Sequence, residues 1–159
     1  MEIKQLFFLP IFICFLCFSC SQNTTTLNDG YYTSEAMNFD NHGWKEYVTI
    51  SVINGKIMAV EYDALNNSGF IKSWDMDYMR RMNAKCGTYP NAYTRYYAGQ
   101  LLNTQTSSEI ECLTGATDSY YTFCQLASSA IERSNSGNTN IVLVHIEESE
   151  HHEEGLPAR

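Results

Sequence analysis

Residues 46–63 read EYVTISVINGKIMAVEYD, and this stretch predicts a β-hairpin. Apolar and polar residues alternate on both sides of Asn54-Gly55, a dipeptide that strongly favours a type I′ turn because both residues tolerate positive φ. A two-residue loop sets the register and places Ile50 opposite Ala59. We therefore expect one buried sheet face, formed by Val48, Ile50, Val52, Ile57 and Ala59.

The segments on either side of the hairpin complete the prediction of an α+β domain. Residues 29–37 indicate a first strand, and NIVLVHI (140–146) indicates a buried strand near the end. Between them, helices are predicted over 74–86, from about residue 90 to 101 and from 118 to 135, because apolar residues recur there at helical spacing. We expect a small antiparallel sheet with helices packed on one face, formed by residues 29–146.

Methionine and tyrosine residues recur along the first two predicted helices. Met76, Met79 and Met82 share one side of the first helix, where methionines fill a core more often than they line a cofactor site. The second helix carries aromatic residues that either cover the core or stack on a planar ligand: Tyr93, Tyr96 and Tyr97.

The composition limits the classes of partner. Of the 159 residues, 44% are hydrophobic and 18% are charged, which suffices for a buried core. The net charge is −8. Nucleic acid is therefore not expected as a partner, because its phosphates are bound with an excess of Lys and Arg.

Residues 1–19 are predicted to be a secretory signal, since the apolar run from Leu6 to Phe18 is too short to span a bilayer. LCFSCSQ (16–22) resembles the lipobox of bacterial lipoproteins, with Cys20 as the lipidated residue. Cleavage by an ordinary signal peptidase and an uncleaved anchor are the alternatives. The resemblance implies an extracytoplasmic protein whose partner is the membrane, reached through a lipid anchor.

The remaining terminal segments are expected to lie outside the fold. Residues 20–28 turn abruptly polar and are interpreted as a flexible tether. Residues 147–159 are acidic and aperiodic, which is typical of a disordered tail.

Three cysteines fall within the predicted domain: Cys86, Cys112 and Cys124. In an oxidising compartment they allow one disulfide and one spare thiol, and small buried side chains are the other interpretation. No pair has the close spacing of a zinc-ligand unit, so no metal site is expected.

Small and hydroxyl residues gather just before the third predicted helix. Thr114-Gly115-Ala116-Thr117 follows residues 107–113, which are expected to be extended, and precedes Asp118 and Ser119. The first amides of a helix lack partners and carry partial positive charge, so the Thr114, Thr117 and Ser119 hydroxyls could complete a seat for a phosphate. Ordinary capping by Thr117 or Asp118 needs no ligand and stays an alternative.

The block ECLTGATDSYYTF (111–123) resembles the signature of the FMN-binding domain family of bacterial extracytoplasmic flavoproteins. The family pattern is an acidic residue, a small residue, any residue, then Ser/Thr-Gly-Ala-Thr/Ser. The positions that match are Glu111, Thr114, Gly115, Ala116 and Thr117. Two positions depart from it, because Glu111 replaces the usual Asp and Cys112 replaces Gly or Ala.

The resemblance extends over most of residues 29–134 and implies a chemistry for Thr117. In that family a flavin transferase uses FAD to attach FMN, through a phosphoester, to the last Thr or Ser of the pattern. We therefore expect FMN as cofactor, held at Thr117 either covalently or non-covalently.

The expected function is a membrane-tethered electron carrier, since no protein acid, base or nucleophile set is found and the flavin supplies the redox chemistry. Tyr31, Tyr32 and Trp44 are candidates to shield its ring. One alternative is a non-redox surface lipoprotein that keeps the fold without flavin. Another is a flavin-dependent reductase with a substrate of its own.

Overall fold

The computed structural model describes residues 26–147. It contains a four-stranded sheet, in which the predicted hairpin supplies one edge strand and the inner strand beside it. The hairpin is formed by β2 (Lys45–Ile53) and β3 (Lys56–Leu65), which are antiparallel. Asn54 and Gly55 join them with φ angles of 54° and 71°. The type I′ turn is confirmed.

The register of the hairpin differs from the prediction beyond the turn. Ile50 lies opposite Val60, not Ala59, because the pairing slips by one residue near Met58. An unslipped β3 would carry Glu61 into the core, whereas this bulge brings Val60, Tyr62 and Ala64 to the buried face. Ala59 is exposed instead.

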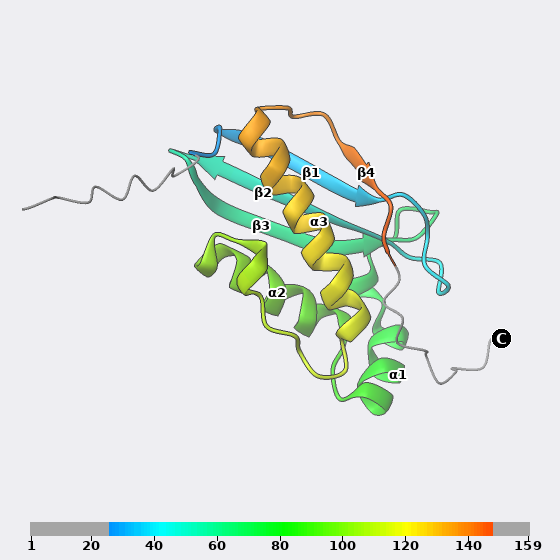
Figure 1. Ribbon diagram of the computed structural model, residues 1–159. Coiled ribbons are helices and arrows are strands. Elements are labelled where there is room, and N and C mark those ends of the chain that lie inside the picture. Colours follow the sequence, from blue (N-terminus) through cyan, green and yellow to red (C-terminus); the bar gives the residue numbers. More distant parts are fainter. Residues whose placement is uncertain (1–25, 148–159) are drawn as a thin grey trace, which may run out of the picture.

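Two further strands complete the sheet, in the order β3-β2-β1-β4 (Figure 1). β1 (Gly30–Ala36) pairs antiparallel with β2, and β4 (Val142–Val144) pairs parallel with β1. The α+β fold is confirmed, but the sheet is mixed rather than antiparallel. β4 is also a short edge strand, in which Leu143 is 51% exposed, and not the buried strand predicted for 140–146.

Three α-helices follow the hairpin: α1 (Met76–Cys86), α2 (Pro90–Thr104) and α3 (Thr117–Ser136). Their bounds lie within three residues of those predicted. Asp75 caps α1 through its side chain, Pro90 opens α2, and Gly137 closes α3 in the left-handed conformation. The segment expected to be extended, 107–113, instead begins with the 3₁₀ turn η2 (Ser107–Glu109).

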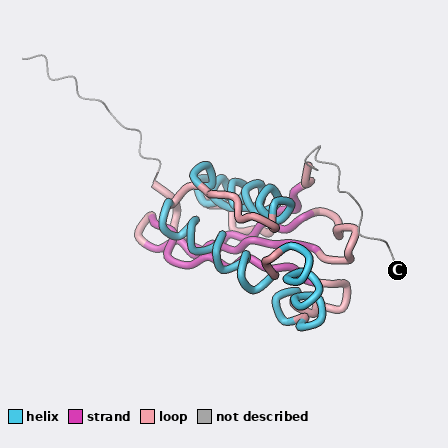
Figure 2. Tube along the Cα trace, turned by 90° about the horizontal axis from the view of Figure 1, so that it is seen from below, coloured by secondary structure: helices cyan, strands magenta, loops and turns pink. Residues whose placement is uncertain are grey.

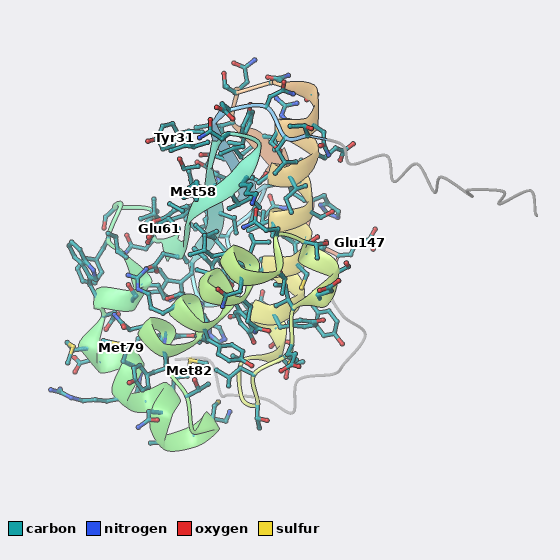
Figure 3. The ribbon with its side chains drawn as sticks, turned by 90° about the vertical axis from the view of Figure 1, so that its left-hand side faces the viewer. Tyr31, Met58, Glu61, Met79, Met82 and Glu147 are labelled. Carbon is teal, nitrogen blue, oxygen red and sulfur yellow. The ribbon has the colours of Figure 1, made fainter. Side chains whose placement is uncertain are left out.

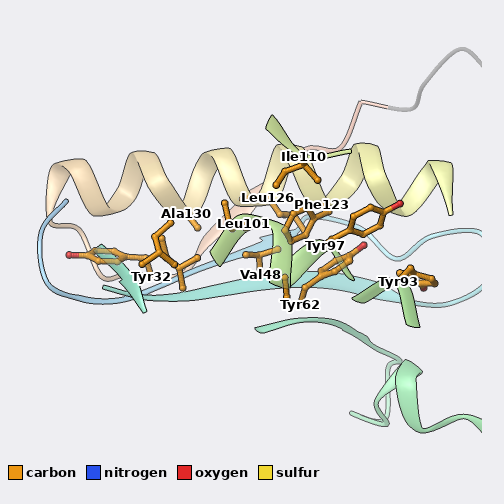
Figure 4. Packing of buried hydrophobic residues seen from close by; sticks show 14 of the residues in the cluster. Tyr32, Val48, Tyr62, Tyr93, Tyr97, Leu101, Ile110, Phe123, Leu126 and Ala130 are labelled. Carbon is orange, nitrogen blue, oxygen red and sulfur yellow. The ribbon is translucent and has the colours of Figure 1, made fainter. Parts of the chain in front are cut away.

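α2 and α3 cover one face of the sheet and enclose the core (Figures 1 and 2). Figure 4 shows the apolar side chains of α3 directed towards the strands. The largest fully buried side chains are Tyr32, Tyr62, Tyr93, Tyr97, Phe123, Ile50, Ile57, Leu101 and Leu126. Burying each large apolar side chain contributes about 1.5–3 kcal/mol, so this layer supplies most of the stabilisation.

α1 lies at one end of the molecule and does not cover the sheet (Figure 1). No residue of α1 is fully buried, and Met76 is 57% exposed. Met82 packs only against the margin of the core. The expectation that the methionine row fills the core is therefore wrong for Met76, because the helix lies beyond the end of the layer that α2 and α3 form with the sheet.

Residues 26–28, expected to belong to the tether, are part of the fold. The Asn28 amide group donates hydrogen bonds to the carbonyls of Ser134 (2.8 Å) and Asn135 (3.0 Å) at the end of α3. Because α3 ends beside the start of β1, the chain enters β4 from that end, and β4 consequently runs parallel to β1. The predicted signal (1–19), Cys20 and residues 148–159 of the acidic tail lie outside the described residues.

Candidate functional site

The predicted phosphate seat lies at the amino end of α3, on the surface. Thr114, Thr117 and Asp118 are exposed, so both threonine hydroxyls are accessible from solvent. Gly115 has a φ of 83°, and a β-carbon there would collide with the carbonyl oxygen of Cys86. A glycine is therefore required where this loop touches the end of α1.

Side chains of α2 hold the loop that leads to the seat. The Tyr97 hydroxyl accepts a hydrogen bond from the amide of Leu113 (3.2 Å) and donates one to the carbonyl of Ala116 (3.0 Å). The Gln100 side chain pairs with both backbone groups of Glu111, at 2.8 Å and 3.1 Å. Because Tyr97 is fully buried, these bonds fix the loop rigidly against the core.

The first turn of α3 keeps unpaired backbone donors. Ala116 occupies the cap position, and no side chain caps the helix. The amide of Tyr120 is the first within α3 to reach a carbonyl, that of Ala116 (2.9 Å). Among the described residues, the amides of Thr117 and Asp118 have no protein acceptor, so capping does not occupy this end of the helix.

Two predicted members of the seat are placed differently. Ser119 is buried, and its hydroxyl donates inward to Glu46 Oε1 at 3.4 Å because this side of α3 faces the sheet. Ala116 is 3% exposed and packs in the core. The accessible part of the seat is therefore Thr114, Thr117 and the amides around Asp118.

The two departures from the family pattern lie at the surface. Glu111 is exposed, and its backbone alone is bonded, to Gln100. Cys112 is an exposed free thiol whose Sγ lies 3.9 Å from Thr117 Oγ1. Sequence reasoning did not indicate this proximity, since five positions separate the two residues along an irregular loop.

An exposed aromatic side chain follows Thr117 along α3, and it is not one of those predicted. Tyr121, one helical turn after Thr117, is 37% exposed and contacts Tyr120 edge-on at 5.2 Å. Tyr32 is buried near Asn28, at the far end of α3, so it does not lie beside Thr117. Trp44 packs against Tyr78 instead.

Two surface hollows lie away from Thr117. A groove of about 520 Å³ runs along α3 beside β4 and includes Cys124 and Ser128. A smaller one of about 240 Å³ lies on the sheet face that no helix covers, around Tyr47. Neither includes a residue of the seat.

A buried ion cluster lies beneath the seat, and no pattern in the sequence indicates it. Lys72 Nζ lies 3.7 Å from Glu46 Oε1 and 3.7 Å from Asp40 Oδ2, with only 5% of the lysine side chain exposed. The Tyr62 hydroxyl donates to Glu46 Oε2 at 2.7 Å. Through Ser119, this cluster ties the first turn of α3 to β2.

The electrostatics of the cluster favour a charged lysine. Burial alone would lower the pKa of Lys72, but Tyr93, Glu46, Tyr78 and Asp40 together raise that pKa above its ordinary value. Burial raises the pKa of Glu46, and the opposing effects of Lys72 and the Tyr62 hydrogen bond offset this only in part. The cluster is therefore a structural support whose integrity depends on both partners.

The comparisons with known proteins assign the chain to a family. The crystal structure of the CPE2226 protein from Clostridium perfringens is similar to this chain, with 34% sequence identity, a TM-score of 0.73 and coverage of 76% of this chain and 99% of CPE2226. The chain belongs to the CPE2226 family. A solution NMR structure from Clostridium thermocellum matches at 28% identity over 78% of this chain and 98% of its own, with a TM-score of 0.48.

A second relative of this CPE2226-family chain carries a descriptive name. The "15 kDa lipoprotein" of Treponema pallidum (strain Nichols) is 29% identical over 119 residues, which are 75% of this chain and 84% of the relative. No protein-family model matches the chain. Within residues 26–147, none of the helices combines the length and the apolar character that crossing a membrane requires.

Proposed function

We propose that this chain is an extracytoplasmic lipoprotein, anchored to a membrane through an acylated Cys20. The segment LCFSCSQ and the similarity to a protein named 15 kDa lipoprotein support the anchor. Intact-mass measurement of the protein from bacterial membranes tests it, because acylation adds the mass of the lipid. A Cys20→Ser variant is expected to lack that mass and to leave the membrane fraction.

The anchored domain holds FMN at the amino end of α3, with its phosphate on Thr117. The observation that carries this proposal is the exposed Thr117 hydroxyl on a helix end that no side chain caps. Unpaired amides, the helix dipole and the Thr114 hydroxyl together make a donor set that fits a phosphoryl group. The exposed part of Tyr121 offers a surface for the ring.

Attachment requires only one reactive group of this chain. Thr117 would hold FMN through a phosphoester to its side-chain oxygen, formed from FAD with release of AMP and of the hydroxyl proton. Tyr97 and Gln100 keep the loop in place during this step. When bound, FMN supplies reversible electron transfer, so the chain itself acts as a carrier.

Co-expression of the full-length chain with a flavin transferase tests the flavin site. Wild type and Thr117→Ser are expected to gain the mass of the FMN phosphoester and to fluoresce on a denaturing gel. Thr117→Ala is expected to lose both signals. Ser128→Ala removes an exposed hydroxyl farther along α3 and is the matched control.

Other outcomes separate the alternatives. Yellow colour that is released on denaturation means FMN bound without the ester. A colourless wild-type protein of unmodified mass contradicts the flavin proposal and favours a non-redox lipoprotein. Turnover of one defined small molecule by the flavin-loaded protein would instead indicate a reductase.

A further inference from the structure

The chain enters the domain at one defined corner. Thr26 lies against the hairpin turn, where its methyl group is 2.6 Å from the position a β-carbon on Gly55 would take. Asp29 Oδ1 accepts a hydrogen bond from the Gly55 amide at 2.9 Å. With the Asn28 bonds to the end of α3, these contacts fix residues 26–29 between the hairpin turn and the end of that helix.

The covalent chain limits how far this corner can lie from the membrane. Six residue steps separate Cys20 from Thr26. A fully extended chain spans at most about 3.6 Å per residue, so the hairpin turn lies within roughly 22 Å of the lipidated residue. The opposite ends of β2 and α3 lie farther away by up to the length of those elements, roughly 30 Å.

Apolar side chains are exposed at the same corner, on the sheet face that no helix covers. Tyr31 is 71%, Ile53 is 50% and Met58 is 56% exposed. Tyr31 and Ile53 project to this face from β1 and β2, and Met58 lies at the β3 bulge. Figure 3 shows Tyr31 and Met58 together at the end of the molecule away from Met79 and Met82. Lys56, next to the turn, is also exposed.

We propose that this corner, formed by Tyr31, Ile53, Lys56 and Met58, rests in the headgroup region of the membrane that holds the lipid anchor. The inference depends on the proposed anchor at Cys20. Tyrosine with its polar tip, lysine with its long stem and two aliphatic side chains suit an interface that is apolar on one side and wet on the other. One acyl chain alone gives only marginal membrane binding, and an apolar contact made by the protein adds to the binding that an anchor supplies.

A second set of exposed apolar residues provides the competing orientation. Phe39, Phe70 and Trp74 lie at the other end of the strands, near Asp40 and Lys72, and Trp74 is 64% exposed. To reach the bilayer with this end, the molecule would have to turn over on the short segment that follows Cys20. The two orientations place different side chains in lipid, which makes them separable.

Quenching of tryptophan fluorescence by brominated acyl chains tests the orientation. The full-length acylated chain is reconstituted into phosphatidylcholine vesicles, with and without phosphatidylglycerol. Met58→Trp is expected to add emission that brominated lipid largely removes. Tyr121→Trp, at the other end of α3, is expected to add emission that survives, and Ile53→Trp repeats the test if Met58→Trp does not fold.

The outcomes test the lipid anchor and the membrane contact separately. Vesicle flotation reports the anchor, so wild-type protein that does not float contradicts the anchor and the contact that depends on it. Protein that floats, with Met58→Trp and Ile53→Trp both left unquenched, overturns the membrane contact alone. Strong quenching of wild-type emission, which comes from Trp44 and Trp74, would show that the opposite end contacts lipid.

Discussion

The carbonyl oxygen of Cys86 fills the space that a β-carbon on Gly115 would occupy. The end of α1 and the loop before α3 therefore touch backbone to backbone. Gly115 also holds a φ of 83°, which side chains rarely adopt.

Gly115→Ala is expected to destabilise the protein by more than the left-handed conformation alone accounts for. That conformation costs roughly 1–2 kcal/mol, and here the carbonyl of Cys86 must move as well. Gly87→Ala is the matched control, because Gly87 has a φ of 72° with no atom near its missing β-carbon. Urea unfolding measures both, and equal losses would contradict the backbone contact.

Lys72→Met is expected to cost about 3–5 kcal/mol, because it leaves the buried Glu46 carboxylate without its cation. Adding Glu46→Gln removes the stranded charge and keeps an acceptor for the Tyr62 hydroxyl. The double variant is therefore expected to be more stable than Lys72→Met alone. Simple addition of the two single losses would show that the pair is not coupled.

Asn28→Asp is expected to cost about 1–2 kcal/mol and to loosen the end of α3. The substitution removes the donor to Ser134 and Asn135 and places a negative charge at the negative end of the helix dipole. Hydrogen exchange of the last amides of α3 is the measurement. Asn138→Asp adds a charge at the same end of α3 but keeps its acceptor role towards Asn140, so it is expected to speed that exchange less than Asn28→Asp does.

Asp29 is expected to make the fold sensitive to acid. Hydrogen bonds from the Gly55 and Asn54 amides lower the pKa of Asp29 below 3.8. A carboxylate whose pKa is lowered by folding stabilises the fold at any pH above its pKa in the unfolded chain. This contribution is lost as the pH falls through the pKa in the folded state. Asp29→Asn is therefore expected to lower the Tm at neutral pH and to match wild type near pH 2.

Glu109→Gln, an exposed carboxylate on η2, serves as the control for that titration. A difference between Asp29→Asn and wild type that persists unchanged into strong acid would mean that the charge of Asp29 does not contribute.

Alkylation at neutral pH is expected to modify Cys112 before Cys124. Cys112 is exposed, whereas burial raises the pKa of the half-buried Cys124 thiol and lowers its thiolate fraction. Peptide mapping after brief iodoacetamide treatment gives the order. Faster labelling of Cys124 would contradict the described arrangement of α3.

The sequence predicted the parts of the fold that depend on local signals. The Asn54-Gly55 turn, the start of α2 near residue 90 and the apolar face of α3 were all visible as short patterns. The bulge near Met58 was not visible as a short pattern. It depends on whether Tyr62 or the neighbouring Glu61 faces the core, which the local sequence does not show. The direction of β4 likewise depends on where α3 ends in space, beside Asn28.

The site was predictable only in part, for the same reason. The position of Thr117 at a helix start follows from adjacent residues, whereas the absence of a side-chain cap was left open by the sequence. The inward turn of Ser119 and the Lys72–Glu46 pair depend on contacts between distant segments. The polarity of Lys72 did not show that this residue, in the 3₁₀ turn η1 (Lys72–Trp74), would be buried beneath α3.

Together with the proposed anchor at Cys20 and the proposed flavin on Thr117, the entry of the chain beside the end of α3 would restrict the electron donor. The helix is about 30 Å long, so a domain that rests on its entry corner with α3 pointing away from the bilayer would hold Thr117 about 30 Å from the last turn and from the lipid. A donor dissolved among the acyl chains, such as a quinol, would not come close to a flavin there. On that proposal, the partners would be proteins whose own redox centres project into the aqueous space or diffuse through it.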